Sequence, residues 1–128
     1  MLSYTFAPAA DTELRAPFSN ELELRQFSDM LVQQIGDGAL EAAKNVAVDN
    51  SHLDDEIAQR NINETFDLLP SKLISDDVYQ TTYVETSKFG RSFIRHQYAF
   101  DNAEQALRCM LTYRRKTDGW RLNQIWCF

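Results

Sequence analysis

Four consecutive segments in the second half of the chain are rich in β-branched and aromatic residues, and turn-forming residues separate them. They read VYQTTYVETS, RSFIRHQYAF, ALRCMLTYRR and WRLNQIWCF. Gly90 marks the first turn, DNAEQ the second and Asp118-Gly119 the third. Asp-Gly between two alternating runs is a strong hairpin signal. The pattern predicts a four-stranded antiparallel meander, because short turns join strands that run in opposite directions.

Three helices are predicted before Pro70. The first starts at Asn20, which forms a capping-box pattern with Glu23, and it ends at the GDG sequence. A short helix follows in ALEAAKNVA, and a third begins after Ser51, where Ser51 and Asp54 repeat the capping pattern. Apolar residues recur at helical spacing in the first and third helices: Leu24, Phe27, Leu31 and Ile35, then Ala58, Ile62, Phe66 and Leu69. Helices followed by an antiparallel sheet predict an α+β domain with the helices packed on one sheet face.

The 128 residues are enough for one domain, and 44% hydrophobic with 25% charged residues is typical of soluble globular proteins. Residues 1–19 are expected to form a loosely ordered arm, because Pro8 and Pro17 oppose regular structure, and residues 20–128 to form the domain. The opening lacks the basic start and apolar stretch of a signal peptide, and no apolar run reaches the ~18 residues of a membrane span. The sequence as given indicates a cytoplasmic protein, or a periplasmic one if a leader was trimmed, with no membrane partner.

Charge is distributed unevenly along the chain. Residues 1–87 contain 5 Lys and Arg and 16 Asp and Glu, a balance of −11, whereas residues 88–128 contain 8 and 3, a balance of +5. The two sum to the net charge of −6. The last third can therefore attract an anion or an acidic partner, while the overall acidity argues against nucleic acid.

The order of elements, with DGWRLNQIWCF and LVQQIGDGALEAAKNVA, resembles the nuclear transport factor 2-like superfamily over roughly residues 20–128. SKFGRSFIRHQYAF followed by LRCMLTYRRKTDGWRL is similar to small bacterial members with no assigned activity. The resemblance implies a cystatin-like fold, in which a curved sheet wraps around helices, and frequent dimerisation through the sheet. It implies no single function, since members include isomerases, dehydratases and non-catalytic binding modules.

Alternation along the strands assigns the side chains to two faces. The more apolar set of each strand is expected to face the helices. These inward sets are Ile94, His96, Tyr98 and Phe100 in the second strand; Leu107, Cys109, Leu111 and Tyr113 in the third; and Trp120, Leu122, Trp126 and Phe128 in the fourth.

The last hairpin has two possible registers. A two-residue Asp118-Gly119 turn sets Leu111 opposite Trp126 and Cys109 opposite Phe128, which places both inward sets on one face. A three-residue loop with a bulge instead pairs Cys109 with Cys127 and turns both tryptophans outward. The first register is favoured, and it predicts that the two cysteines form no disulfide.

The outward set mixes cations with apolar side chains, which is typical of an interaction surface. Its predicted partner-binding residues are Arg91, Phe93, Arg95, Arg108, Met110, Arg114, Lys116 and Arg121. The expected partner is a second copy of the chain or an acidic protein. The alternative is that long Arg and Lys stems simply cover sheet surface.

The inner face is the candidate small-molecule pocket, lined by Tyr79, Thr81, Tyr83, His96, Tyr98 and Trp126. The first three join it if the first hairpin turns near Lys88–Gly90 with a two-residue loop. His96 is a candidate general base, and Tyr83 or Tyr98 a candidate donor to a developing oxyanion. The alternative is a structural histidine satisfied by a hydrogen bond. No inward carboxylate can be placed beside His96, so no catalytic residue is carried over from the family.

The sequence contains no Gly-rich phosphate loop, no His/Cys cluster with metal spacing and no motif-defined nucleophile. No cofactor and no metal are therefore predicted. The favoured function is a non-enzymatic binding or accessory module. The alternative is a cavity enzyme of isomerase or lyase type that uses His96 with a tyrosine.

Overall fold

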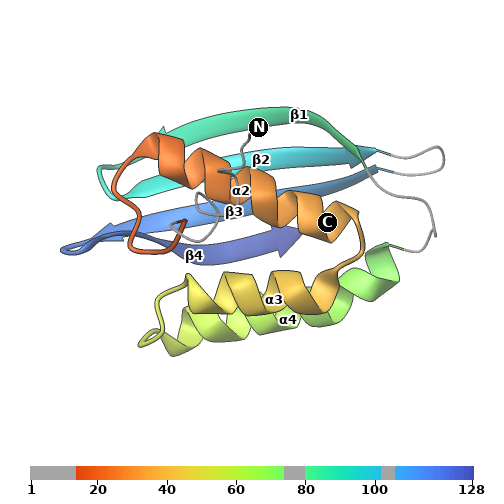
Figure 1. The fold of residues 1–128 in the computed structure, drawn as a ribbon, viewed down its shortest axis with the longest axis horizontal. Helices are drawn as coiled ribbons and strands as arrows, with labels where there is room; N and C mark the ends of the chain where they lie inside the picture. Colours follow the sequence, from red (N-terminus) through yellow and green to blue (C-terminus); the bar gives the residue numbers. More distant parts are fainter. Residues whose placement is uncertain (1–13, 74–79, 102–105) are drawn as a thin grey trace, which may run out of the picture.

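A computed structural model of the chain describes residues 14–73, 80–101 and 106–128, without the side chains of 80–85, 101 and 106. Three helices precede four strands (Figure 1). They are α2 (Glu21–Gly36), α3 (Leu40–Asp49) and α4 (Glu56–Lys72), then β1 (Gln80–Phe89), β2 (Phe93–Asp101), β3 (Ala106–Lys116) and β4 (Gly119–Cys127). The strands form one antiparallel sheet in the order β1-β2-β3-β4, which confirms the predicted α+β meander.

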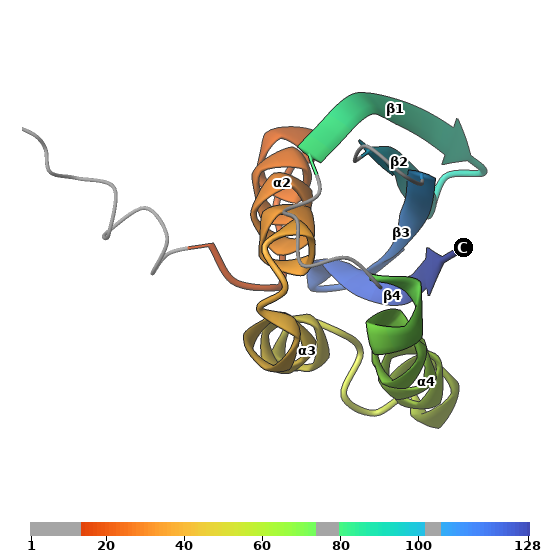
Figure 2. The same ribbon diagram turned by 90° about the vertical axis from the view of Figure 1, so that its right-hand side faces the viewer.

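The sheet curves around α2, which lies against its concave face (Figure 2). α3 packs against both α2 and α4, and α4 lies along β4 at one end of the strand order. Figure 2 shows the opposite, convex face of β1, β2 and β3 turned away from these three helices. We call this convex face the outer face.

The helix ends follow from local capping. The Asn20 side chain accepts the Glu23 N–H at 3.0 Å, and the Glu23 carboxylate accepts the Ser19 N–H at 2.9 Å, so the predicted start of α2 is confirmed. The predicted start of α4 is too early. Asp55, not Ser51 or Asp54, is the cap, because its carboxylate accepts the N–H groups of the next turn.

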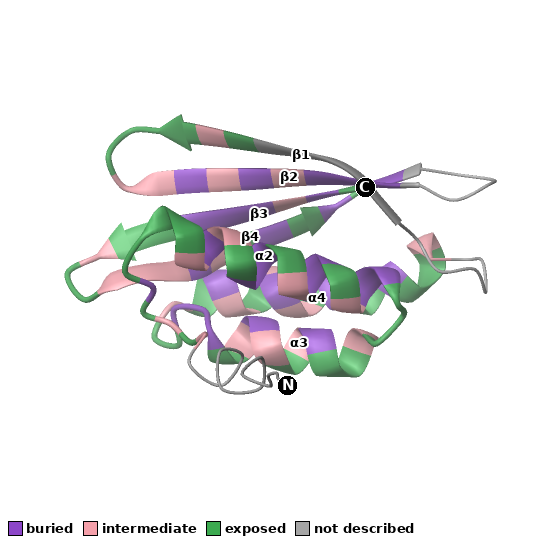
Figure 3. Cartoon of the chain, turned by 45° about the horizontal axis from the view of Figure 1, so that its top comes forward, coloured by how far each residue is buried: buried purple, intermediate pink, exposed green. Residues whose placement is uncertain are grey.

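The predicted inward sets of the helices, β2 and β3 are confirmed. Half-buried and buried residues alternate along β2 from Phe93 to Tyr98, and Ala99 and Phe100 are both buried (Figure 3). The core joins both helix stripes to the inward residues of the second and third strands, and the residues buried in it include Leu24, Phe27, Leu31, Ile35, Ile62, Leu69, Ile94, Tyr98, Phe100, Leu107, Leu111 and Tyr113. A single core between α2 and the concave sheet face is the main source of stability, because apolar burial dominates folding.

The β3–β4 turn lies one residue earlier than predicted. Lys116 pairs with Gly119, so Thr117 and Asp118 form the two-residue turn. A bulge at Asn123 then shifts the pairing by one residue. The bulge has a physical reason, since it turns both Leu122 and Ile125 toward the core although they are three positions apart, and both are fully buried.

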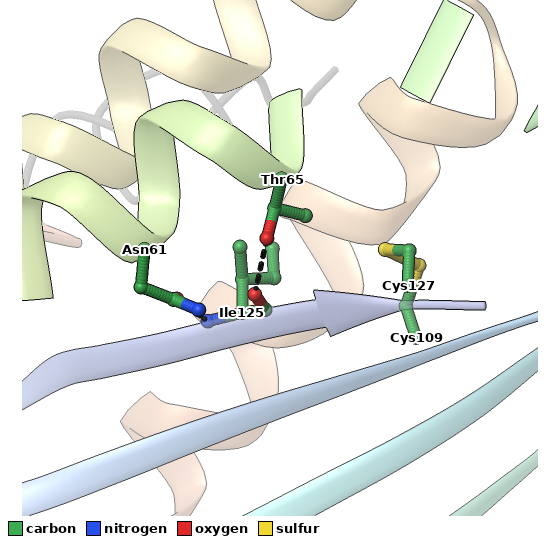
Figure 4. Close-up of a disulfide and its surroundings, with 5 residues drawn as sticks. All are labelled: Asn61, Thr65, Cys109, Ile125 and Cys127. Atoms are coloured by element: carbon green, nitrogen blue, oxygen red, sulfur yellow. Dashed lines mark hydrogen bonds between the residues drawn. A yellow bond between two sulfur atoms is a disulfide. The ribbon is translucent and has the colours of Figure 1, made fainter. Parts of the chain in front are cut away.

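The same bulge brings the two cysteines together. Past it, Leu111 pairs with Ile125 and Cys109 with Cys127, so the expected pairings with Trp126 and Phe128 are wrong. Cys109 and Cys127 form a disulfide with a Cα–Cα distance of 4.1 Å, contrary to the prediction of no disulfide (Figure 4). Both cysteines are buried.

The edge of β4 that faces away from β3 is hydrogen-bonded at Trp120 and at Leu122. Trp120 exchanges two backbone hydrogen bonds with Phe18, at 2.8 and 2.9 Å, and the Leu122 N–H donates to the Asn50 carbonyl at 3.0 Å. Phe18 is itself fully buried, so the packed structure begins before Asn20, within the segment expected to be a loose arm. Closing an edge in this way removes a site of unwanted strand pairing.

Candidate functional site

Four side chains of β1, β2 and β3 form a continuous stack on the outer face. The rings of Phe89 and Phe93 lie parallel with centroids 5.3 Å apart. The guanidinium of Arg95 lies 4.9 Å from the Phe89 centroid, and that of Arg114 lies 5.8 Å from the Phe93 centroid. Cation–π contacts of this kind hold both guanidinium groups in place on the sheet surface.

Strand register produces this stack. Phe89 pairs with Phe93 across a three-residue loop, and Phe93 pairs in turn with Arg114, so the three side chains lie in one row across the sheet. Arg95 belongs to the next row, opposite Thr112. The sequence did not indicate Phe89, because the expected two-residue loop puts it outside the paired strands.

The stacked arginines have no carboxylate partner among the described residues. The buried Nε of Arg95 also lacks a hydrogen-bond partner there. Arg108, two rows further along the same face, is exposed and makes no described ion pair either. A guanidinium whose donors are unused offers a site for an external acceptor, above all a carboxylate.

The remaining cations of the predicted partner surface lie elsewhere or are already paired. Lys116 lies 3.8 Å from Asp54, and Arg121 lies 3.2 Å from Asp118, at the tip of the β3–β4 hairpin. Arg91 is exposed in the β1–β2 loop. Among the described residues, the sheet cations without an ion-pair partner on the outer face are therefore Arg95, Arg108 and Arg114, on β2 and β3.

An apolar area adjoins these cations at the end of β4. Trp126 pairs with the half-buried Met110 on the outer face, and Trp126 and Phe128 are 51% and 52% exposed. With Leu68 of α4, Trp126 and Phe128 help to line a hollow of about 140 Å³. Trp126 was expected in the inner pocket, and the bulge at Asn123 is the reason that it lies on the other face.

On the inner face, His96 is part of a buried hydrogen-bonded chain. Its Nδ1 lies 2.7 Å from the Ser28 hydroxyl, which lies 2.5 Å from the Tyr113 hydroxyl. His96 is 2% exposed, and Ser28 and Tyr113 are fully buried. Burial, followed by the positive charge of Arg25, lowers the pKa of His96 to about 4. The imidazole is therefore neutral near pH 7, and its Nδ1 is hydrogen-bonded to Ser28.

Tyr98 is similarly engaged. Its hydroxyl donates to the Asp29 carboxylate at 2.6 Å, and Asp29 also lies 3.8 Å from the guanidinium of Arg25. Burial, followed by this hydrogen bond, raises the pKa of Tyr98 well above its ordinary value. Asp29 is a carboxylate near the inner face that the sequence reasoning did not place there, since it lies on α2.

The other predicted pocket residues are only partly described. Tyr79 lies outside the described residues, and the side chains of Thr81 and Tyr83 lie outside the described side chains. The three-residue β1–β2 loop pairs Tyr83 with Ala99 and Thr86 with His96 in the backbone register. This pairing differs from the one that the two-residue loop implies.

His52 was not singled out by its sequence context, and it is almost fully buried beside the β3–β4 turn. Its Nε2 has no hydrogen-bond partner in the described part of the chain, and His52 borders a hollow of about 440 Å³ with Lys116 and Arg121 among the lining residues. Burial, followed by the charge of Lys116, lowers the pKa of His52. The two cations of this hollow already bind Asp54 and Asp118, so the hollow offers little free charge.

Within the described residues, no group of three or more His, Cys, Asp or Glu side chains is arranged to hold a metal ion. None of the described helices is long and apolar enough to cross a membrane. Comparisons of the chain with protein-family models, with curated proteins and with solved structures found no match.

Proposed function

We propose that this chain is a non-enzymatic binding or accessory module of the nuclear transport factor 2-like kind, which docks a macromolecular partner through the outer face of its sheet. The observation that carries the proposal is the stack of Arg95, Phe89, Phe93 and Arg114. It combines guanidinium groups that have no ion-pair partner among the described residues with apolar surface, on a face that α2, α3 and α4 leave open. Arginine and aromatic side chains are enriched at the centres of protein interfaces.

The inner face supports the same proposal by contrast. The hydroxyls of Ser28 and Tyr113 and the Nδ1 of His96 bond to one another in a buried chain, which is typical of structural polar groups. A general base must reach a substrate proton within hydrogen-bond distance. The cavity enzyme using His96 and a tyrosine is therefore the weaker alternative.

Charge reversal on the outer face tests the proposal. Sedimentation velocity over a range of concentrations compares the wild-type chain with Arg95→Glu and Arg114→Glu, and with Arg60→Glu on the exposed side of α4 as the matched control. If the partner is a second copy, we expect a dimer that only the outer-face variants dissociate. If the partner is another protein segment, we expect a monomer whose binding to that segment is lost in the same two variants. A monomer that binds no ligand through this face overturns the proposal.

A further inference from the structure

The outer face is built as a series of rows, and each row has its own chemistry. The first row holds Phe89, Phe93, Arg114 and the already paired Arg121, and the second holds Ser87, Arg95, Thr112 and Gln124. The third row holds Gln97, Met110 and Trp126, and the fourth holds Ala99, Arg108 and Phe128. Successive rows are two residues apart, or about 7 Å at the usual rise of a strand. From the C-terminal end of β3 toward its N-terminal end, the four rows are therefore cationic, cationic, apolar and cationic. The cation of the second row, Arg95, comes from β2.

We infer that the outer face binds an extended acidic protein segment with the pattern acidic–x–acidic–x–apolar–x–acidic, laid along β3 and running antiparallel to it. This inference rests on the proposed function and names its partner. An extended chain also presents every second side chain to one side at about 7 Å spacing, so its side chains match the rows one to one. Acidic residues then meet Arg114, Arg95 and Arg108, and the apolar residue meets Met110 and Trp126.

Charge complementarity argues for an acidic partner in place of a second copy. Two outer faces brought together place unpaired arginines against unpaired arginines, which is repulsive. No carboxylate among the described side chains of the face relieves this, and Glu85, opposite Gln97 in the register, lies outside those side chains. A two-fold dimer through this face therefore has no described acid to receive Arg95 or Arg114.

The net charge and the stacking of Phe89 on Phe93 argue against single-stranded nucleic acid, although Trp126 and Phe128 are half exposed. Binding of that kind uses exposed aromatic faces on which bases stack. The rings of Phe89 and Phe93 already stack on each other and on the two guanidinium groups. The net charge of the chain is also −6, which repels a polyanion. A protein segment, which carries few charges and one apolar anchor, fits the face better.

Fluorescence anisotropy with a labelled peptide tests this inference. The probe is Glu-Ser-Glu-Ser-Leu-Ser-Glu, and the controls are a peptide with Lys for every Glu and a permuted peptide of the same composition, Glu-Glu-Glu-Ser-Ser-Ser-Leu. We expect binding that weakens as salt rises, and a loss of about tenfold for Arg95→Gln or for Arg114→Gln. Arg60→Gln, an exposed arginine on α4, is the matched control and should bind as the wild type does.

A second variant tests the apolar row. Trp126→Ala should weaken binding of the probe peptide more than it weakens binding of the same peptide with Ala in place of Leu. Only the Leu side chain is long enough to contact the apolar row. Equal binding of the permuted peptide, or tighter binding of a twenty-nucleotide oligo-dT than of the probe, overturns the inference.

The sedimentation experiment separates the two proposals. If no peptide binds but Arg114→Glu dissociates a dimer, the inference fails and the proposed function stands. If no peptide binds and the chain stays monomeric, both fail.

Discussion

Asn61 of α4 accepts the backbone N–H of Ile125 in β4 at 2.9 Å, and Thr65, one helical turn on, donates to the carbonyl of the same residue at 2.7 Å (Figure 4). The two side chains thus supply a partner to both backbone groups of an edge-strand residue that is itself fully buried. The helix closes the sheet edge through side chains, without a fifth strand in the described part of the chain.

Asn61→Ala should destabilise the fold by about 1–3 kcal/mol, because it leaves a buried N–H without a partner. Asn63→Ala is the matched control, since Asn63 lies on the same helix and makes no described side-chain hydrogen bond. Urea unfolding measures both free energies of unfolding. Equal values for the two variants would show that the edge contact adds nothing to stability.

The Cys109–Cys127 disulfide closes a loop with a sequence separation of 18. Replacing both cysteines with alanine should lower the free energy of unfolding by about 3 kcal/mol, because the cross-link restricts the unfolded chain. Mass spectrometry after alkylation under denaturing conditions should find no free thiol in protein purified without reductant. Two alkylated cysteines in every molecule would contradict the disulfide.

Stability should fall as the solution becomes more acidic than pH 6.5. His96 titrates near pH 6.5 when unfolded and at about 4 when folded, so the unfolded state binds the proton first. At pH 5 this difference in pKa lowers the free energy of unfolding by about 2 kcal/mol. His52, whose pKa is also lowered, acts in the same direction.

Urea unfolding at pH 7 and at pH 5 measures this dependence. His96→Gln removes the largest contribution, so its two free energies of unfolding should lie closer together than those of the wild type. An unchanged pH dependence in this variant would show that the imidazole is not held neutral in the folded state.

Gly119 lies at the close approach of the last hairpin to the N-terminal segment. A Cβ at this position, where φ is +129°, meets the Phe18 carbonyl oxygen at 2.8 Å. Gly119→Ala should therefore cost more than Gly38→Ala, since Gly38 has a φ of +81° but no atom within 4 Å of an added Cβ. Thermal unfolding compares the two variants, and a larger loss in Gly38→Ala would contradict the packing of Phe18 on the hairpin.

The elements that the sequence predicted well are those with an undisturbed period. The stripe from Leu24 to Ile35 on α2 and the alternation of β2 place the same side chains inward in the sequence and in the structure. The inward set predicted for β4 was wrong. Strict alternation holds only for a strand without a bulge, and it favoured the larger tryptophans as core residues. Leu122, Ile125 and Cys127 form the buried set, and the three-residue step between the first two is the signal of a bulge.

The candidate site depended on these same details. The predicted outer cations Arg95, Arg108 and Arg114 lie where the alternation put them, since β2 and β3 pair without a bulge. Because the register shifts at the bulge, Trp126 lies on the outer face and not on the inner face. Because the β1–β2 loop has three residues, Phe89 pairs with Phe93 and lies on the outer face as well. The pairing of the strands, more than the local sequence pattern, decides which aromatic residues lie beside the cations on the outer face.

The most direct measurement of the central claim is the affinity of the probe peptide Glu-Ser-Glu-Ser-Leu-Ser-Glu for the wild-type chain and for Arg114→Gln, with Arg60→Gln as the control. Arg114→Gln should lose about tenfold in affinity, while Arg60→Gln should lose none. Equal affinities for all three proteins, or no binding to any of them, would contradict the assignment of the outer face as a site for an acidic segment.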